Sequence, residues 1–215
     1  MGIKENTESM NSVLLKVLAK FIIITKIDKL SLLFGRINTR ISSEIVRLKL
    51  KSQHGVYIHP PFRIIGYNYI HLSGNFSSLS NLRIECLDKY NGETFYPNLE
   101  IGNNVNFNSD CHVGCINYIQ IGDNVLVGSK VMIVDHSHGK SSELDIPPSK
   151  RQLYSKGPII IGSNTWICEN VCILPNVKIG SNCIIGAGAV VNIDVPDNSI
   201  AVGNPIRIIE NKIYK

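Results

Sequence analysis

Two histidines stand where the chain changes character, and histidine is the side chain best suited to proton transfer near neutral pH. The segment Asp135-His136-Ser137-His138 closes an apolar stretch, and a polar loop, residues 139–158, follows it. Neutral imidazole, whose unperturbed pKa is about 6.5, can take the proton of a hydroxyl whose oxygen attacks a carbonyl. We therefore expect His136 to be a general base, with His138 and Asp135 as supporting residues. Neighbouring residues on a strand face opposite ways, so a backbone carbonyl is an equal candidate to orient the imidazole. From position alone, a solvated corner histidine is the alternative.

The elements that must position these side chains come from a six-residue repeat. From Ile161 to Pro196 the chain divides into frames of six, in which position one is always Ile or Val and position five is small or β-branched. A three-sided coil, with one short strand and one corner per frame, explains this period. Positions one and five then face inward and stack on the next coil, while Gly and Asn suit the corners. Clean frames begin at Ile101, so we predict a solenoid over 101–196 from which loop 139–158 protrudes.

This repeat resembles the left-handed parallel β-helix of the hexapeptide-repeat acyltransferases, and the resemblance covers residues 101–209. The phrases Gly186-Ala187-Gly188-Ala189 and Gly203-Asn204-Pro205 are similar to that family's closing coil and coenzyme A end. The resemblance implies a mainly β fold, a homotrimer with its sites between subunits, and direct transfer from acetyl-CoA without a metal. It also implies that His136 is the base, because the family's catalytic histidine likewise precedes a protruding loop.

The resemblance further implies a set of residues around acetyl-CoA. Trp166, the only tryptophan, would lie near the coil of His136, beside the thioester channel or the acceptor; the alternative is a surface aromatic that packs under the loop. The expected coenzyme A contacts are Trp166, Cys168, Ala187, Gly188, Asn204, Pro205 and Arg207. Two positions depart from the family: Cys168 stands where relatives commonly have Gly, and Ile193 where they often have Lys.

The leading hypothesis is an acetyl-CoA-dependent O-acetyltransferase acting on a sugar hydroxyl, similar to galactoside, maltose and surface-polysaccharide acetyltransferases. Its expected setting is capsule or O-antigen biosynthesis. Three alternatives stay open. One is an N-acetyltransferase on an amino sugar, and another is a solenoid without catalysis, used for assembly or binding. The third is a γ-carbonic-anhydrase-like enzyme with zinc on His112, His136 and His138, although the spacing is unlike that family's.

Charge and cysteine content limit the remaining classes. Residues 1–52 hold 10 of the 22 Lys and Arg but only 4 of the 17 Asp and Glu, so the basic character belongs to this segment. The solenoid has no basic run with interleaved aromatics, and we expect no nucleic-acid partner. No secretory signal is evident, and the six cysteines favour reduced thiols in a cytoplasmic protein. Their spacings are not usual for zinc, so no metal is expected.

The first 52 residues form a basic amphipathic segment that we predict to be helical. Gly35 is the expected break between two helices. Two apolar helical faces fit the sequence: Leu14, Val17, Leu18 and Phe21, then Ile41, Ile45 and Leu48. We weigh two roles for it: a helical pair that packs on the solenoid or joins subunits, and a contact of residues 13–50 with the inner face of the cytoplasmic membrane. Residues 53–100 are expected to be irregular first coils, and 197–215 a C-terminal cap at the coenzyme A end.

Overall fold

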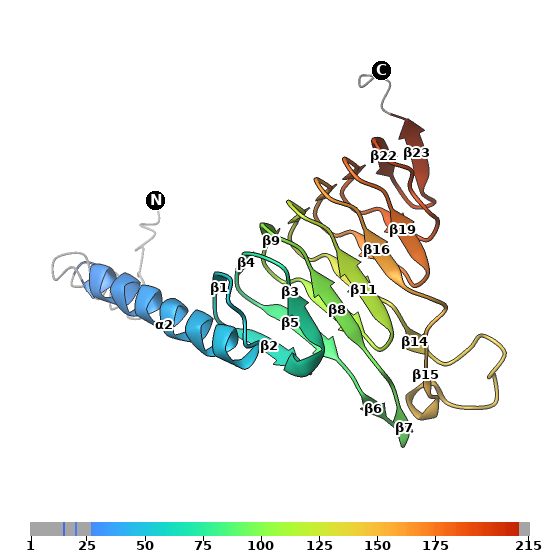
Figure 1. Ribbon diagram of the computed structural model, residues 1–215, viewed down its shortest axis with the longest axis horizontal. Helices are drawn as coiled ribbons and strands as arrows, with labels where there is room; N and C mark the ends of the chain where they lie inside the picture. Colours follow the sequence, from blue (N-terminus) through green and yellow to red (C-terminus); the bar gives the residue numbers. More distant parts are fainter. Residues whose placement is uncertain (1–14, 16–19, 21–26, 211–215) are drawn as a thin grey trace, which may run out of the picture.

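The computed structural model describes Leu15, Lys20 and residues 27–210. This part of the chain is mainly β, with one long helix at the N-terminal end of three parallel sheets (Figure 1). From Val56 the chain passes from one sheet to the second, then to the third, and returns to the first. Each turn therefore adds one strand to every sheet, which gives a three-sided coil.

The three sheets are named A, B and C in the order in which the chain visits them. Sheet A contains β1 (Val56–Ile58), β4 (Phe76–Ser78), β9 (Val105–Phe107), β12 (Leu126–Val127), β17 (Trp166–Ile167), β20 (Ile184–Ile185), β22 (Ser199–Val202) and β23 (Arg207–Glu210). Sheet B contains β2 (Phe62–Ile65), β5 (Leu82–Cys86), β10 (His112–Cys115), β13 (Met132–Val134), β18 (Cys172–Ile173) and β21 (Val190–Val191). Sheet C contains β3 (Ile70–Leu72), β8 (Asn98–Ile101), β11 (Tyr118–Ile121), β16 (Ile159–Ile161) and β19 (Val177–Ile179). All pairs within these sheets are parallel except β22 with β23.

The inward positions of the repeat are filled as the sequence predicts. The residues at position one are at most 1% exposed: Ile161, Ile167, Ile173, Ile179, Ile185 and Val191. Those at position five are at most 2% exposed: Thr165, Val171, Val177, Cys183, Ala189 and Val195. No coil can bury these side chains alone, so each coil depends on its neighbours for its core.

One corner of the coil is built from a column of asparagines. Each has a positive φ between 56° and 58°, which asparagine tolerates better than most residues. Each side-chain amide donates to the next one along the column at 3.0–3.2 Å. The members of this asparagine ladder are Asn104, Asn124, Asn164, Asn182 and Asn198. The repeat therefore selects Asn here both for its backbone freedom and for its side-chain stacking.

The coil begins earlier than the clean repeat does. Strands β1 to β5 already pair in the same three sheets, so residues 53–100 supply two coils, with the short 3₁₀ turn η1 (Tyr67–Tyr69) in the first. Their repeat is obscured by the inserted hairpin β6 (Lys89–Tyr90) and β7 (Glu93–Thr94). Loop 139–158 leaves the same corner two coils later, through β14 (Ser137–His138), η2 (Pro148–Lys150) and β15 (Leu153–Tyr154). Figure 1 shows the hairpin and the loop projecting side by side.

The predicted break at Gly35 is wrong, because a single helix, α2 (Ile27–Lys49), runs through it. An added Cβ at Gly35 would meet nothing within 4 Å, so the helix interior simply tolerates the glycine. The predicted face Leu14, Val17, Leu18 and Phe21 lies outside the described residues. No helix in the described ranges is long and apolar enough to cross a membrane.

The face of α2 that contacts the coil is polar in part. Thr39, Ser43 and Val46 are buried against β1, and the Ser43 hydroxyl accepts the backbone N–H of Ile58 at 2.9 Å. This helix therefore covers the free edge of the first strand, which would otherwise present unpaired backbone groups. Ile41, Ile45 and Leu48, the face predicted from apolar spacing, point the other way and are 47–61% exposed.

Candidate active site

His136 lies at the corner between sheets B and C, directly after β13 and before loop 139–158. Its side chain is only 12% exposed, whereas His138 is exposed on β14. The rigid strand fixes the backbone of His136, and the protruding loop begins three residues later. This corner therefore presents an imidazole on a fixed frame beside a projecting loop.

The Asp135 carboxylate, and not a backbone carbonyl, is the partner of the His136 ring. Asp135 Oδ1 lies 2.9 Å from His136 Nδ1, and the Asp135 side chain is fully buried. The same carboxylate accepts the backbone N–H of Ile116 at 3.0 Å and of Asn117 at 2.9 Å. Three donors thus hold the Asp135 side chain in place. A carboxylate at Nδ1 places the ring proton there, so that Nε2 carries the lone pair.

Gly114 provides the surface on which the His136 ring rests. A Cβ at this position would lie 3.2 Å from His136 Cε1 and 3.3 Å from a methyl group of Val134. Gly114 pairs with Val134 on one side and with Glu85 on the other. The ring therefore lies over the outer face of sheet B, in the space that a side chain at residue 114 would fill.

His138 contacts a residue that the sequence did not single out. Its Nδ1 lies 3.3 Å from the Tyr90 hydroxyl, and the two rings meet edge to face at 5.6 Å. Tyr90 belongs to the inserted hairpin, whose Asn91 also bonds the loop: the Gln152 amide donates to Asn91 O at 2.9 Å. His138 thus connects the loop to the hairpin. It forms no hydrogen bond with the His136 ring, whereas Asp135 does.

The histidines proposed as a zinc set contact different partners. His112 Nδ1 lies 2.8 Å from an Arg83 guanidinium nitrogen, while His136 contacts Asp135 and His138 contacts Tyr90. Burial, and then the Arg83 charge, lower the pKa of His112 below its ordinary value. Within the described ranges no group of three or more His, Cys, Asp or Glu side chains could hold a metal ion.

The residues expected around coenzyme A lie along a different corner, between sheets A and B. Trp166 is 47% exposed on the outer face of β17, Cys168 follows it, and Ala187 and Gly188 occupy the same corner one coil later. Gly188 has a φ of +71° and open space where a Cβ would be, so its backbone can be approached closely. Further along, Asn204, Pro205 and Arg207 are exposed at the turn into β23. Sheet B separates this corner from His136 within one chain.

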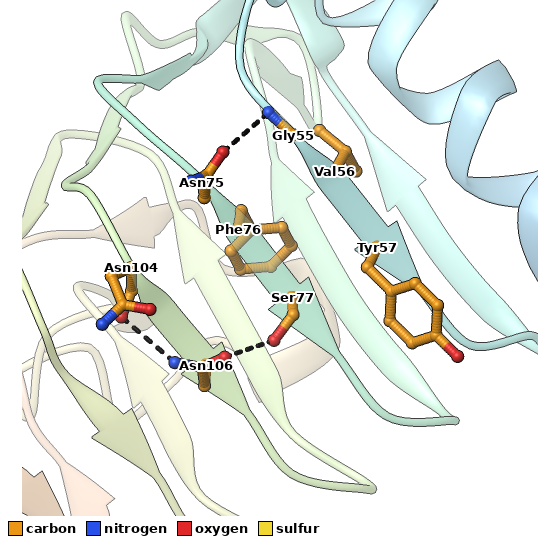
Figure 2. A pocket seen from close by; sticks show the side chains of 8 residues that line it. All are labelled: Gly55, Val56, Tyr57, Asn75, Phe76, Ser77, Asn104 and Asn106. Atoms are coloured by element: carbon orange, nitrogen blue, oxygen red, sulfur yellow. Dashed lines mark hydrogen bonds between the residues drawn. The ribbon is translucent and has the colours of Figure 1, made fainter.

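A hollow of about 230 Å³ opens on the outer face of sheet A, over β1, β4 and β9. Figure 2 shows Tyr57, Ser77 and Asn106 on its floor, with the Ser77 hydroxyl bonded to the Asn106 amide. This hollow combines the aromatic residues Tyr57 and Phe76 with hydroxyl and amide groups. It faces away from His136 of the same chain, because His136 follows a strand of sheet B.

The cysteines are free and four of the six are buried. Burial raises the pKa of Cys111 to about 11 and is the main cause that raises the pKa of Cys168. For Cys115, the neighbouring Cys86 thiol and then burial raise the pKa. These thiols are therefore protonated at neutral pH and are poor nucleophiles.

Residues 158–192 match the model of the bacterial transferase hexapeptide (six repeats) family. The chain is 35% identical over 147 residues to a putative lipopolysaccharide biosynthesis O-acetyl transferase, WbbJ of Escherichia coli, which covers 66% of this chain and 71% of that protein. It is 39% identical over 116 residues to the galactoside O-acetyltransferase of Escherichia coli, covering 54% of this chain and 55% of that protein.

Among solved structures, the chain resembles AntD, an N-acyltransferase from Bacillus cereus in complex with dTDP and 3-hydroxybutyryl-CoA. The TM-score is 0.58 at 20% identity, over 72% of this chain and 78% of that chain. At this identity the likeness concerns the fold alone. The chain spans about half the length of the galactoside enzyme that it matches, and over two thirds of the length of the first relative.

Proposed function

Because this chain belongs to the hexapeptide-repeat acetyltransferases and is thus an acyltransferase, we propose that it moves an acetyl group from acetyl-CoA to a sugar hydroxyl. The setting we propose is the biosynthesis of a capsule or O-antigen polysaccharide, and the scaffold is a left-handed β-helix. Support for the O-acetyl assignment comes from the two O-acetyltransferases to which the chain is 35% and 39% identical.

The observation that carries the proposal is the ring of His136 held at Nδ1 by a buried carboxylate. Nε2 takes the proton of the acceptor hydroxyl while the oxygen attacks the thioester carbonyl, so that a C–O bond forms. The C–S bond then breaks, and the imidazolium returns the proton to the coenzyme A sulfur. Asp135 stabilises the imidazolium between the two steps without taking its proton.

We propose that the working unit is a homotrimer, because one chain does not gather the whole site. His136 lies at the corner between sheets B and C, and Trp166, Cys168, Ala187 and Gly188 lie at the corner between sheets A and B. A second copy that turns its sheet A toward sheet B of the first would bring the two sets into one cleft. Trp166 of one subunit then meets His136 of the next, and Arg207 faces the nucleotide phosphates.

Mixed oligomers test this arrangement. Subunits with His136→Ala and subunits with Trp166→Ala are each expected to be nearly inactive alone. Mixing the two variants should restore activity, because some clefts will then combine the intact His136 of one subunit with the intact Trp166 of its neighbour. Recovery of no activity after verified subunit exchange would mean that each site belongs to a single chain.

We also propose that α2 lies on an anionic membrane surface at the inner face of the cytoplasmic membrane. Phe34, Ile37, Ile41, Ile45 and Leu48 form an apolar stripe, 44–63% exposed, on the face opposite the one that contacts β1. The stripe therefore faces away from the coil, and the N-terminal half of α2 extends past the strands (Figure 1). The exposed arginines beside it, Arg36 and Arg40, suit anionic lipid headgroups.

Flotation with vesicles tests the membrane contact. The full chain should float with anionic vesicles and not with zwitterionic ones, and Ile41→Asp with Ile45→Asp should abolish flotation. Leu144→Asp, an exposed apolar side chain on the loop, is the matched control and should leave it unchanged. If the Asp variants instead change the oligomeric state and leave flotation intact, the stripe contacts another copy.

The direct test of the proposed reaction is release of the coenzyme A thiol with a panel of sugar acceptors. Acetyl transfer to hydroxyl acceptors that disappears in His136→Ala supports the proposal. If acetyl is transferred only to amino sugars, the enzyme is an N-acetyltransferase. If there is no transfer and no affinity for coenzyme A, the protein is a solenoid without catalytic activity.

A further inference from the structure

A row of charged and polar side chains crosses the outer face of sheet B toward His136. The register pairs Arg63 of β2 with Arg83 of β5, and Arg83 with His112 of β10. Two residues further along β5, Glu85 pairs with Gly114, the residue beneath the His136 ring. The row therefore begins at the coil covered by α2 and ends at the proposed base.

Contacts within this row leave positive charge in excess. Glu85 is 3.4 Å from Arg63 Nε and 3.7 Å from Arg83 Nε, so two guanidinium groups share one carboxylate. The Arg63 and Arg83 side chains are 66% and 49% exposed, whereas Glu85 is 18% exposed. Both guanidiniums thus present donors to solvent while the carboxylate between them is largely covered.

His112 presents a polar atom of the same row. The Arg83 guanidinium can only donate, so the Nδ1 atom that it contacts is an acceptor and the ring proton is on Nε2. That Nε2 is buried and has no hydrogen-bond partner among the described residues, although Glu85 Oε2 lies 3.4 Å away. The Nε2 donor thus has only this long contact with Glu85.

A hollow of about 290 Å³ lies beside the arginines. Its lining consists of Pro61, Phe62, Arg63, Asn81, Leu82 and Arg83. It thus combines apolar walls with two guanidinium groups. Neighbouring strands are about 4.8 Å apart, so β5 lies about 10 Å and β2 about 14 Å from the coil that carries His136. The Arg83 guanidinium reaches one strand closer, to His112 Nδ1 on β10, whereas the Arg63 guanidinium contacts Glu85 on β5.

We propose that this row binds the sugar acceptor and that the acceptor sugar is joined to a phosphate or diphosphate. Arg63 and Arg83 hold the phosphate, while Glu85 and His112 bond the sugar between the arginines and His136. The inference rests on the proposed sugar acetylation and adds the class of acceptor to it. The arginine guanidinium group can donate two parallel hydrogen bonds to two oxygens of one phosphate.

The place of Arg63 favours a phosphate link over an acid group on the acetylated sugar itself. A carboxylate on the same ring would stay within about one ring width of the attacked hydroxyl, whereas the Arg63 guanidinium contacts Glu85 on β5, about two strand spacings from the His136 coil. A phosphate at the reducing end of a short saccharide spans that length. Nucleoside diphosphate sugars and prenyl diphosphate-linked sugars share this chemistry.

The test compares one sugar in four forms: its methyl glycoside, its glycosyl 1-phosphate, its nucleoside diphosphate ester and its prenyl diphosphate ester. We expect kcat/KM for at least one phosphorylated form to exceed that for the methyl glycoside by about 10- to 100-fold, mainly through KM. A higher kcat/KM for the nucleoside diphosphate ester would identify a nucleotide carrier, and a higher kcat/KM for the prenyl diphosphate ester would identify a lipid carrier. Higher salt should reduce the preference.

Arg63→Gln and Arg83→Gln, alone and together, should bring the ratio of phosphorylated to methyl acceptor toward one. Lys178→Gln, an exposed cation on sheet C, is the matched control and should leave the ratio unchanged. The inference is overturned if the ratio is near one in the wild type, if the Arg variants leave it unchanged, or if a uronic acid glycoside is preferred. If the methyl glycoside is still acetylated in those cases, the proposed sugar O-acetyltransferase function stands and only the inference on the phosphate is wrong. If none of the four forms is acetylated, the proposed function itself is refuted.

Discussion

Replacing Asp135 by Asn separates two roles of this side chain: its negative charge beside His136, and its hydrogen bonds to backbone N–H groups at the corner. The two carboxylate oxygens share one partner and differ in another: Ile116 N donates to Oδ1 at 3.0 Å and to Oδ2 at 3.2 Å. Oδ1 also faces His136 Nδ1 at 2.9 Å, whereas Oδ2 also accepts from Asn117 N at 2.9 Å. A carboxamide must place its NH2 group at one of these two positions. At Oδ2 it would oppose the N–H of Asn117, so we expect it at Oδ1, next to the ring.

In that orientation the amide donates to His136 Nδ1, and the ring proton moves to Nε2. The tautomer that can accept a proton from the acceptor hydroxyl is then disfavoured, and the imidazolium loses its counter-charge. The corresponding Asp→Asn change in a serine-protease triad costs about 10⁴-fold, and general-base catalysis as a whole contributes about 10²- to 10⁴-fold. We expect kcat to fall by about 10²- to 10⁴-fold, with little change in the KM for acetyl-CoA.

Stability should fall as well, because the N–H of Ile116 keeps only its longer contact, to an oxygen that no longer carries charge, at a cost of about 1–3 kcal/mol. The assay is coenzyme A thiol release at a temperature where unfolding curves show the variant to be folded. Asp123→Asn is the matched control, because Asp123 Oδ1 also accepts a corner N–H, that of Asn103 at 2.7 Å, and forms no hydrogen bond with a histidine among the described residues. The control should retain parental kcat. A folded Asp135→Asn variant with kcat within threefold of the parent would refute the assigned role of the carboxylate.

Four further outcomes follow from the structure. Gly35→Ala should raise the free energy of unfolding by about 0.5–1 kcal/mol, measured by denaturant titration, because residue 35 is in a helix interior with open space around it; a loss would mean that α2 is broken there. Asn164→Ala should destabilise by about 2–3 kcal/mol, through two lost ladder bonds and the left-handed backbone, while Asn164→Gly should cost less. Because the native state lowers the pKa of His112 from its ordinary 6.5, the unfolded chain binds more protons as pH falls through 6.5; stability should decline below that pH, and His112→Gln should flatten the decline in urea midpoints. In the native protein a thiol reagent should label Cys168 and Cys172 ahead of the four buried cysteines; equal labelling of all six would contradict the closed core.

Much of the fold follows from the sequence because a six-residue period leaves few ways to face apolar side chains inward. Ile161 and its counterparts occupy the core, and Asn164 and Asn182 occupy the corners, as that period requires. The place of His136, at a strand end before the loop, also followed from where the repeat breaks. These are local properties: each depends only on a residue's position within its own frame.

The tertiary structure decided what depends on register between coils of unequal length. Arg63 and Arg83 lie 20 residues apart, whereas Arg83 and His112 lie 29 apart because the hairpin of Tyr90 is inserted between them, and yet all three share one row. The alternation of side chains along a strand could not identify the partner of the His136 ring. Asp135 lies at a corner where the backbone turns, so the two neighbouring side chains can face each other. Likewise α2 has a polar and an apolar face, and its contact with the free edge of β1 required the hydroxyl of Ser43 and not the apolar stripe. Sequence period fixes which way a residue points within a coil, whereas its neighbours across coils are set by insertions, corners and edges that the period does not encode.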